Sequence, residues 1–251
     1  MVDELGKNFI EQTKYQNMGL TPQKQGAPYP VYSQPPSGKF PIIILPKPDK
    51  LTISGVDLRS TMEQRISVRR YTEDAISLDE LSYLLWLTQG VKNILPNTLT
   101  MRTVPSAGAR HPFETWLSIN RVETLKPGLY HFEASSHELE QVKLGEVFNQ
   151  QLTQAILNQQ QVATSAVTFI WVAQPYRTSW RYGSRAYRYI YLDAGHVCQN
   201  LHLAAESIGC GVCAIGAYDD DAVNQLLELD GEEQFVIYMA SLGRKTSNDI
   251  D

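Results

Sequence analysis

Helical and strand patterns alternate along this chain, and two of the strand patterns are separated by only a few residues. Residues 128–133 (GLYHFE) and 138–145 (ELEQVKLG) have the composition of strands, and the turn at 134–137 between them is too short for a crossover connection. The two strands must therefore pair antiparallel. Helices interleaved with an antiparallel pair favour an α+β fold over a regular doubly wound parallel sheet.

The strongest helix pattern covers residues 77–90, SLDELSYLLWLTQG. Ser77 and Glu80 have the spacing of a capping box, the leucines that follow share one face, and Gly90 ends the pattern. The remaining predicted elements are helices at 57–65, 146–160, 184–208 and 219–229, and strands at 115–120, 165–173, 210–216 and 234–243.

Most of the chain's 13 prolines fall within residues 21–48. Proline fixes its own φ angle and lacks a backbone donor, so this stretch favours an extended arm over a helix. We therefore divide the chain into an N-terminal extension at 1–56, which carries the proline-rich arm, and a folded domain at 57–251. The arm is either a linker or disordered leader, or a segment that packs on another subunit.

Composition restricts the classes of partner. A chain of 251 residues with 43% hydrophobic content can build one full core, and a net charge of −5 gives no reason to expect nucleic acid or an anionic membrane as a partner. The N-terminus has early acidic residues and no apolar run, and the cluster PIIILP at 41–46 is too short to span a bilayer. We expect a soluble, cytoplasmic protein without membrane contact.

Residues 65–71, RISVRRY, form the first candidate for a binding site. If this segment is extended, Arg65, Ser67, Arg69 and Tyr71 point to one side, and the apolar residues between them point to a core. Guanidinium groups and a hydroxyl along one edge suit a phosphate or a chain of hydroxyls. The alternative is a surface edge whose arginines pair with nearby acidic residues.

The second candidate is the loop at 103–114, TVPSAGARHPFE, which has little side-chain bulk. Such a stretch is either a plain turn before a strand or a place where a flat ligand approaches the main chain. A serine-hydrolase interpretation is weak, because Val104 occupies the position where a nucleophile elbow needs glycine. Ser106, His111 and Asp193 would supply the residue types of a triad, but the sequence does not bring them together.

Several other polar features have weaker implications. Arg185 and Arg188 begin a helix whose dipole disfavours cations there, so they need either a bound anion or acidic residues on a neighbouring element. Arg244 follows a buried strand directly and could reach an anionic ligand or remain solvated.

The cysteine and histidine spacings argue against a metal or redox site. Cys210 and Cys213 would face opposite sides of a strand, and three cysteines make no disulfide framework. His196 and His202 are separated by about 240° around one helix, so they cannot share an ion. A buried, hydrogen-bonded His196 is expected instead.

The order of these features resembles the FMN-dependent nitroreductase family over residues 60–244. The resemblance depends on RxSxRxY at 65–71, a helix that ends in Gln-Gly, PSAGARHP at 105–112, a long helix, a small-residue strand with Ile-Gly, and a strand that ends in Gly-Arg. Further stretches resemble one branch of the family, the dehydrogenases that oxidise azolines to thiazoles and oxazoles in ribosomal peptides. These stretches are PGLYHF, YGSRAYRYIYLDAGHVCQNLHLAAE and IGAYDDDAVNQLL.

The resemblance implies a fold, an oligomeric state and a cofactor. The implied fold is a nitroreductase-like α+β sandwich with a central, mostly antiparallel sheet flanked by helices. The implied assembly is a homodimer that binds FMN at its interface. The residues implied for the phosphate and ribityl chain are Arg65, Ser67 and Arg69, with Arg244 completing the phosphate contact. Those implied along the isoalloxazine are Pro105, Ser106, Ala107, Gly108 and Ala109, with one main-chain N–H near N5, and Ile215 and Gly216 at its other edge.

One departure from the resembled branch concerns a substrate base. Azoline dehydrogenases carry an adjacent Lys-Tyr pair for removing a substrate proton, and this chain has Arg181-Tyr182 at that position. Arginine cannot act as a base at ordinary pH, so this residue weakens the interpretation as an azoline dehydrogenase. Tyr182 becomes the candidate acid or base.

The sequence therefore predicts an FMN-dependent oxidoreductase that passes hydride through flavin N5. The donor would be NAD(P)H and the acceptor a small molecule or peptide that the sequence does not identify. The missing GxGxxG motif does not count against NAD(P)H, because a two-step flavin enzyme needs only transient access of the nicotinamide. The alternatives are an azoline dehydrogenase subunit of a peptide-tailoring complex and a flavin-binding protein without turnover.

Overall fold

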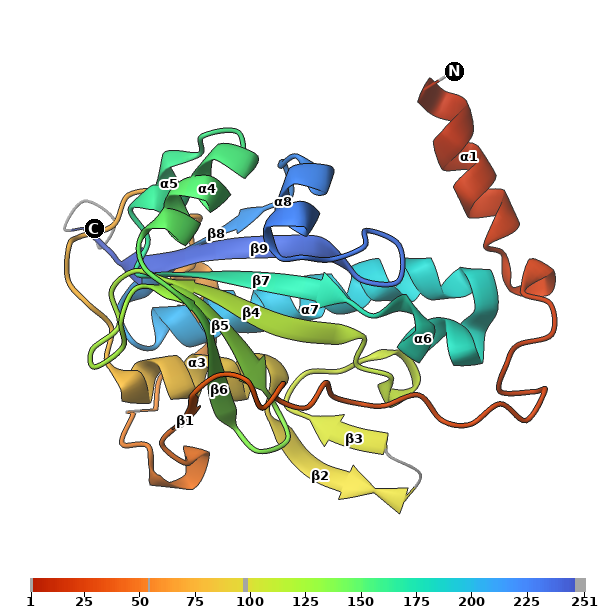
Figure 1. Ribbon diagram of the computed structural model, residues 1–251, viewed down its shortest axis with the longest axis horizontal. Coiled ribbons are helices and arrows are strands. Elements are labelled where there is room, and N and C mark those ends of the chain that lie inside the picture. Colours follow the sequence, from red (N-terminus) through yellow and green to blue (C-terminus); the bar gives the residue numbers. More distant parts are fainter. Residues whose placement is uncertain (1, 54, 97–98, 247–251) are drawn as a thin grey trace.

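The computed structural model describes residues 2–53, 55–96 and 99–246. Within them, a seven-stranded sheet has the order β1-β6-β5-β4-β7-β9-β8, and every neighbouring pair of its strands is antiparallel (Figure 1). The strands are β1 (Ile42–Ile44), β4 (Phe113–Ile119), β5 (Gly128–Glu133), β6 (Glu138–Leu144), β7 (Val167–Ala173), β8 (Cys210–Ile215) and β9 (Phe235–Arg244). The predicted α+β fold with a mostly antiparallel central sheet is confirmed.

Helices cover both faces of this sheet (Figure 1). On one face, α3 (Leu78–Gln89) packs on α7 (Ala186–Glu206), and on the other α4 (Val147–Ala155) packs on α8 (Asp220–Leu226). Each face has its own hydrophobic cluster, and fully buried members include Leu84 and Ile190 on the first and Phe148 and Val223 on the second. The inner strand β7, VTFIWVA, is buried at every position because it is covered from both sides.

Local sequence signals explain where the main helices begin. The Ser77 hydroxyl accepts a hydrogen bond from the Glu80 N–H at 3.2 Å, and the Glu80 carboxylate accepts one from the Ser77 N–H at 2.7 Å, which completes the predicted capping box of α3. Asp57 caps α2 (Leu58–Gln64), and Asp219 caps α8 in the same way.

Some predicted boundaries differ from the structure. The helix predicted at 146–160 is two helices, α4 and α5 (Gln160–Ala163), because Leu157 and Asn158 have φ angles of 61° and 57° and break the helical path. Two elements have no predicted counterpart: α1 (Val2–Gln12) and the hairpin of β2 (Val91–Leu95) and β3 (Leu99–Arg102). Helix α6 (Pro175–Tyr182) lies in a stretch to which no element was assigned.

The proline-rich arm packs along its own chain, so the linker or disordered-leader interpretation is wrong. The Gln34 N–H donates to the Glu114 carboxylate at 2.9 Å, and the Arg102 guanidinium donates to the Tyr32 carbonyl at 2.9 Å. At the end of the arm, β1 pairs with β6 as an edge strand of the sheet. The division of the chain at residue 56 stays a prediction, although the extension already contributes this strand.

Helix α1 projects from the body in Figure 1, and α7 holds its C-terminal end. Arg185 donates to the Thr13 carbonyl at 2.8 Å, while Arg188 donates to the Thr13 hydroxyl at 2.5 Å and to the Ile10 carbonyl. The predicted anion or acidic partner is therefore wrong for both arginines. Instead, carbonyls at the negative end of α1 accept their hydrogen bonds. Among the described residues, no helix is both long and apolar enough to cross a membrane.

Candidate functional site

The loop at 105–109 has an unusual backbone. Ala107–Ala109 forms a single 3₁₀ turn (η4), and Gly108 has a φ of 58°. Ala109 and His111 also have positive φ angles, 53° and 45°, which non-glycine residues rarely adopt. Pro105 and Gly108 are exposed, so the loop presents its main chain to solvent. Strained backbone of this kind is concentrated at ligand-binding sites.

Asp193 on α7 holds this loop in place. The Ser106 hydroxyl donates to the Asp193 carboxylate at 2.5 Å, and the Ala107 N–H donates to it at 3.2 Å. Burial raises the pKa of Asp193, although the hydrogen bonds from Ser106 and Ala107 oppose that shift. The sequence alone gave Asp193 no role beyond the weak triad.

The serine-hydrolase interpretation is wrong. Ser106, His111 and Asp193 do come together, but the contact of His111 with the Ser106 hydroxyl is its backbone N–H, at 2.9 Å. Within the described part of the chain, no imidazole accepts the Ser106 proton, because the hydroxyl donates to Asp193. Burial, reinforced by the charge of Arg102, lowers the pKa of His111 to about 3.

Tyr182 and Arg181, at the end of α6, lie against the same loop. A Cβ at Gly108 would lie 2.5 Å from the Tyr182 hydroxyl oxygen and 3.2 Å from Arg181 Cδ, so only glycine fits there. The Tyr182 ring makes an edge contact with Tyr189, with ring centroids 4.8 Å apart. The structure therefore brings the predicted acid or base next to the predicted flavin loop.

Arg110 is a further residue of this region that the sequence analysis did not single out. Only 6% of the residue is exposed, and its guanidinium carbon lies 5.8 Å from the Tyr29 ring centroid and 5.4 Å from that of Trp180. Its Nε–H donates to the Gly108 carbonyl at 3.3 Å. Burial, reinforced by the nearby charge of Arg181, lowers the pKa of Arg110.

The segment 65–71 follows its predicted pattern only in part. Ser67 and Arg69 are exposed and Val68 is buried, as expected, but Ile66 is 44% exposed and Tyr71 is buried. The Tyr71 hydroxyl donates to the Val68 carbonyl at 2.8 Å instead of facing a ligand. Strict alternation fails because the segment makes only one isolated bridge, Ser67 to Val212, among the described residues.

Close packing on β8 fixes the position of this segment. A Cβ at Gly211 would lie 2.4 Å from a methyl group of Val68, so the glycine lets the segment lie directly on the strand. Arg69 keeps most of its donors available. Its Nη1 donates to the Ser67 carbonyl at 3.3 Å, and its side chain also hydrogen-bonds Cys213.

Two of the predicted cofactor residues have other structural roles. Arg244 donates to both carboxylate oxygens of Glu80 at 2.7 Å and to the Ile208 carbonyl at 2.6 Å. Its geometry therefore does not support the predicted phosphate contact. Ile215 is 1% exposed and belongs to a core cluster, so only its main chain could line a ring, whereas Gly216 is exposed.

Helix α7 separates the two parts of the predicted site within one chain. Asp193 contacts the loop. His202 lies beside Arg65, and burial, reinforced by the charge of Arg65, lowers the pKa of His202 to about 4. The separation of nine positions corresponds to about 13.5 Å along the helix axis.

The remaining candidates for metal or redox chemistry have ordinary surroundings. Cys198, Cys210 and Cys213 are buried and free, and burial raises the pKa of Cys210 to about 12. No cluster of three potential metal ligands occurs in the ranges that the structure describes. His196 is exposed, so the prediction that it is buried is wrong.

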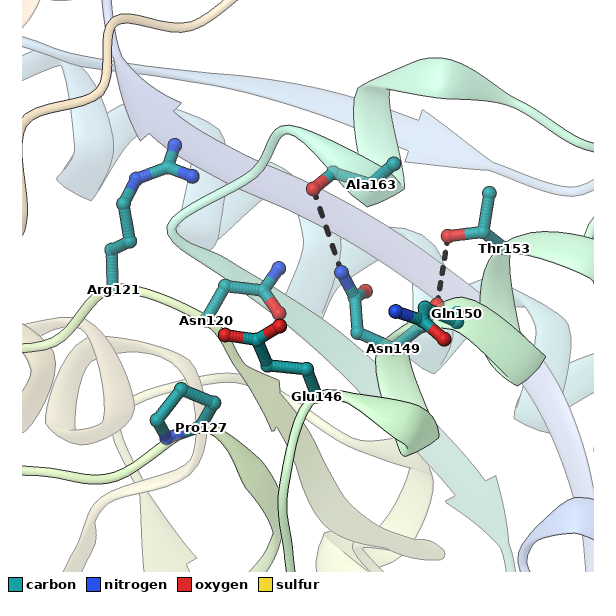
Figure 2. Close-up of a pocket in the computed structure, with 8 residues that line it drawn as sticks. All are labelled: Asn120, Arg121, Pro127, Glu146, Asn149, Gln150, Thr153 and Ala163. Carbon is teal, nitrogen blue, oxygen red and sulfur yellow. Dashed lines mark hydrogen bonds between the residues drawn. The ribbon is translucent and has the colours of Figure 1, made fainter.

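A cavity of about 510 Å³ lies at the opposite end of β4 from the loop (Figure 2). Its lining includes Asn120, Arg121 and Asn149, and the Asn149 amide donates to the Ala163 carbonyl at 3.4 Å. Arg121 Nε and Asn149 Oδ1 are buried without partners among the described residues. None of the predicted site residues lines this cavity, so it is separate from the candidate site.

Comparisons with known proteins identify the family of this chain. The nitroreductase family model matches residues 62–244. The archaeal protein MJ1384 of Methanocaldococcus jannaschii, provisionally named a nitroreductase, is 31% identical over 193 residues, which cover 77% of this chain and 93% of that protein. The trifolitoxin-processing protein TfxB of Rhizobium leguminosarum bv. trifolii is 27% identical over 154 residues, 60% of this chain and 41% of TfxB.

Solved structures give the same fold. A provisionally assigned nitroreductase from Anabaena variabilis has a TM-score of 0.65 and 32% identity over 76% of this chain, which spans 38% of that longer chain. A chain of the Escherichia coli microcin synthetase McbBCD complex has a TM-score of 0.60 and 18% identity, with 97% of this chain and 93% of that chain covered. The family match covers most of the sequence and both halves of the candidate site, and the chain belongs to the nitroreductase family.

Proposed function

We propose that this protein is an FMN-dependent oxidoreductase that transfers hydride through the flavin. The observation that carries the proposal is the loop at 105–109, which has small side chains and positive φ angles and lies beside Tyr182. A second observation is that Ser67 and Arg69, whose groups suit an anion, are both exposed. Membership of the nitroreductase family supports it.

The residues present fit FMN in chemical type. Arg69, Arg65 and Ser67 would hold the phosphate, since guanidinium forks and hydroxyls donate well to phosphate oxygens. Residues 105–109 would lie along the flat ring. Within the described residues, the Gly108 N–H has no hydrogen-bond partner, so it is free to donate to the ring. The Ala107 N–H is not free, because it donates to Asp193.

The separation of the two halves along α7 supports a site shared by two copies. Tyr187, Tyr191 and Leu192 form an apolar stripe on α7 that is 39%, 59% and 60% exposed. On α2, Leu58 and Met62 are 60% and 54% exposed. Large apolar surfaces of this kind mark interfaces. In the proposed homodimer, the loop of one copy faces Arg65 and Arg69 of its partner.

FMN, when bound, supplies the hydride chemistry at N5, with NADH or NADPH as the proposed donor. The chain's own residues bind and orient it. Tyr182, whose hydroxyl lies at Gly108, is the group placed to hold or deliver a proton at the substrate. Arg181 and the Gly108 N–H add positive potential beside the loop, which favours developing negative charge.

A second candidate function is peptide tailoring, as a dehydrogenase subunit that works with a cyclodehydratase. The similarity to a trifolitoxin-processing protein favours it. Arg181 beside Tyr182 argues against azoline oxidation, because a guanidinium does not accept a proton from a substrate.

The proposal is tested on the protein as purified. We expect it to be yellow, to contain FMN, to be bleached by NADH or NADPH without oxygen, and to regain its colour with a quinone or a nitroaromatic. A coloured protein that no nicotinamide reduces would indicate a flavin-binding protein without turnover. A protein that neither contains FMN nor binds added FMN would contradict the proposal.

A further inference from the structure

Arg110 has little exposed surface, yet its guanidinium contacts two aromatic rings and pairs with no carboxylate among the described residues. The residue is 6% exposed, and its one hydrogen bond there is from Nε to the Gly108 carbonyl at 3.3 Å. Neither Nη1 nor Nη2 donates to a described protein atom, and no described carboxylate lies within 4.0 Å of this guanidinium. A guanidinium with so little exposed surface and no paired carboxylate is available to an anion from outside the chain.

A second unpaired guanidinium lies next to it. Arg181 Nε is 3.3 Å from the Cβ position of Gly108, the residue whose carbonyl binds Arg110. Arg181 makes no ion pair among the described residues, and its guanidinium carbon lies 5.6 Å from the Tyr182 ring centroid. Two like charges therefore converge on one loop residue without a protein anion between them.

The nearby carboxylate cannot neutralise this pair. Asp193 on α7 is the acidic group that contacts the loop, and it already accepts hydrogen bonds from the Ser106 hydroxyl and the Ala107 N–H. On the other side of Arg110 stand the ring faces of Tyr29 and Trp180, which tolerate a cation but supply no negative charge. The surroundings of Gly108 are thus electropositive, and Gly108 itself is exposed.

We propose that Arg110 and Arg181 bind an oxyanion of the substrate, a carboxylate or a phosphate, and thereby orient that substrate at the loop. Guanidinium groups bind both oxyanions through paired N–H donors, and a buried anion site of this kind adds specificity. The inference rests on the proposed function only for the statement that the substrate reacts at this loop. The oxyanion comes either from a carboxylate-bearing acceptor or from the nicotinamide donor.

The binding part can be measured without turnover. Benzoate and benzamide have the same ring and differ in charge, and Trp180 beside Arg110 provides a fluorescence signal in addition to calorimetry. We expect benzoate to bind the FMN-loaded protein at least tenfold more tightly than benzamide, because of the charge-assisted hydrogen bonds. Arg181→Gln should reduce the ratio of the benzamide Kd to the benzoate Kd about tenfold, and Arg181→Lys should restore part of that ratio.

Arg181 is the safer position to vary, because its side chain is exposed and holds no protein hydrogen bond within the described residues. Lys143→Gln is the matched control: it removes one positive charge from an exposed residue of β6, near the opposite end of the sheet from the loop. Thermal unfolding and FMN content of each variant show whether fold and cofactor are retained, which separates failure of this inference from failure of the proposed function.

Two kinetic arms identify the source of the oxyanion. The first compares 4-nitrobenzoate with nitrobenzene as acceptors, and the second compares NADPH with NADH as donors, each by the ratio of kcat/KM. If Arg181→Gln loses the preference for 4-nitrobenzoate over nitrobenzene, the site binds a carboxylate acceptor. If it loses the preference for NADPH over NADH, the site binds the donor's phosphate. If neither ratio changes and benzoate binds Arg181→Gln as it binds the unaltered protein, the inference is wrong.

Discussion

At the scale of single residues, the structure divides the arginines near the candidate site into two classes. Arg244 donates both of its Nη2 hydrogen bonds to Glu80. Arg69 is exposed, and the one oxygen acceptor of its guanidinium among the described residues is the Ser67 carbonyl in its own segment. Residue type alone cannot distinguish these cases, because both arginines follow apolar strand-like segments. The distinction depends on Glu80, which the capping box of α3 fixes in position.

Arg69→Ala is predicted to weaken FMN binding. The lost charge-assisted hydrogen bond corresponds to about 1.5–3 kcal/mol, or roughly a 10- to 100-fold increase in Kd. Quenching of flavin fluorescence during titration of the apoprotein measures this. Arg59→Ala is the control, since Arg59 is exposed on neighbouring α2 and pairs with Glu63 on the same helix. Equal Kd values for Arg69→Ala and the unaltered protein would refute the phosphate assignment.

Arg244→Gln is predicted to lower stability while leaving FMN affinity unchanged. It removes both hydrogen bonds to Glu80, whose side chain is 17% exposed, so a partly buried carboxylate loses its cation. Because solvent partly screens this pair, we expect a loss of about 1–3 kcal/mol in the free energy of unfolding. Urea unfolding and the same FMN titration measure the two quantities. A weaker FMN affinity with unchanged stability would indicate that Arg244 binds the phosphate after all.

At the scale of elements, sequence signals were sufficient where local chemistry decides the structure. The capping box of α3, the Asp219 cap of α8 and the short hairpin turn between β5 and β6 each act within a few residues, and each was predicted. The arm was ambiguous because its conformation depends on distant partners. Its contacts with Glu114 and Trp180 lie 80 and more than 150 positions away, so no local pattern reveals them.

The same limit applies to the candidate site. The loop and the segment 65–71 were identified from their composition, but Arg110, Arg181 and the anchoring role of Asp193 depend on how α6 and α7 pack against the loop. Tyr71 and Ile66 were misplaced, because the alternation rule assumes a regular strand and this segment is only bridged at Ser67.

Truncation is predicted to separate the two parts of the N-terminal extension. Deletion of residues 1–12 removes α1, whose described hydrogen bonds to the body go mainly to Arg188, so the Tm should change little. Deletion of residues 1–34 also removes the hydrogen bonds to Trp180 and Glu114 and exposes the Trp180 ring. We expect a clear fall in Tm in thermal unfolding. Equal Tm values for the two truncated proteins would show that the arm does not stabilise the fold.

At the scale of the whole molecule, buried histidines predict a loss of stability in acid. Burial lowers the pKa of His137 to about 4, and only 9% of the residue is exposed. The folded state therefore binds fewer protons than the unfolded state between the ordinary pKa near 6.5 and the folded value. Stability should be fully present above about pH 6.5 and decrease toward pH 4, by up to about 1.4 kcal/mol per pH unit for this residue.

His137→Gln tests this pH dependence. His137 Nε2 lies 2.7 Å from the Ser82 hydroxyl, and its Nδ1 is buried without a partner among the described residues, so a second proton would be unpaired. Urea unfolding at about pH 7 and about pH 5 should show a smaller pH-dependent loss for the variant, by roughly 2 kcal/mol. Identical pH-dependent losses in the two proteins would mean that His137 does not titrate as stated.

In the proposed homodimer, the loop of one copy and the arginines of another form a single flavin site. The most direct measurement is the FMN content of a heterodimer of Arg69→Ala and Gly108→Val, purified through two different affinity tags. Each variant alone should bind little FMN, Gly108→Val because its side chain would meet Tyr182 and oppose the positive φ. The shared site predicts that the heterodimer places both changes in one site, leaves the other intact and binds one FMN. A folded heterodimer that binds no FMN would contradict the claim, since each chain would then hold a complete but damaged site of its own.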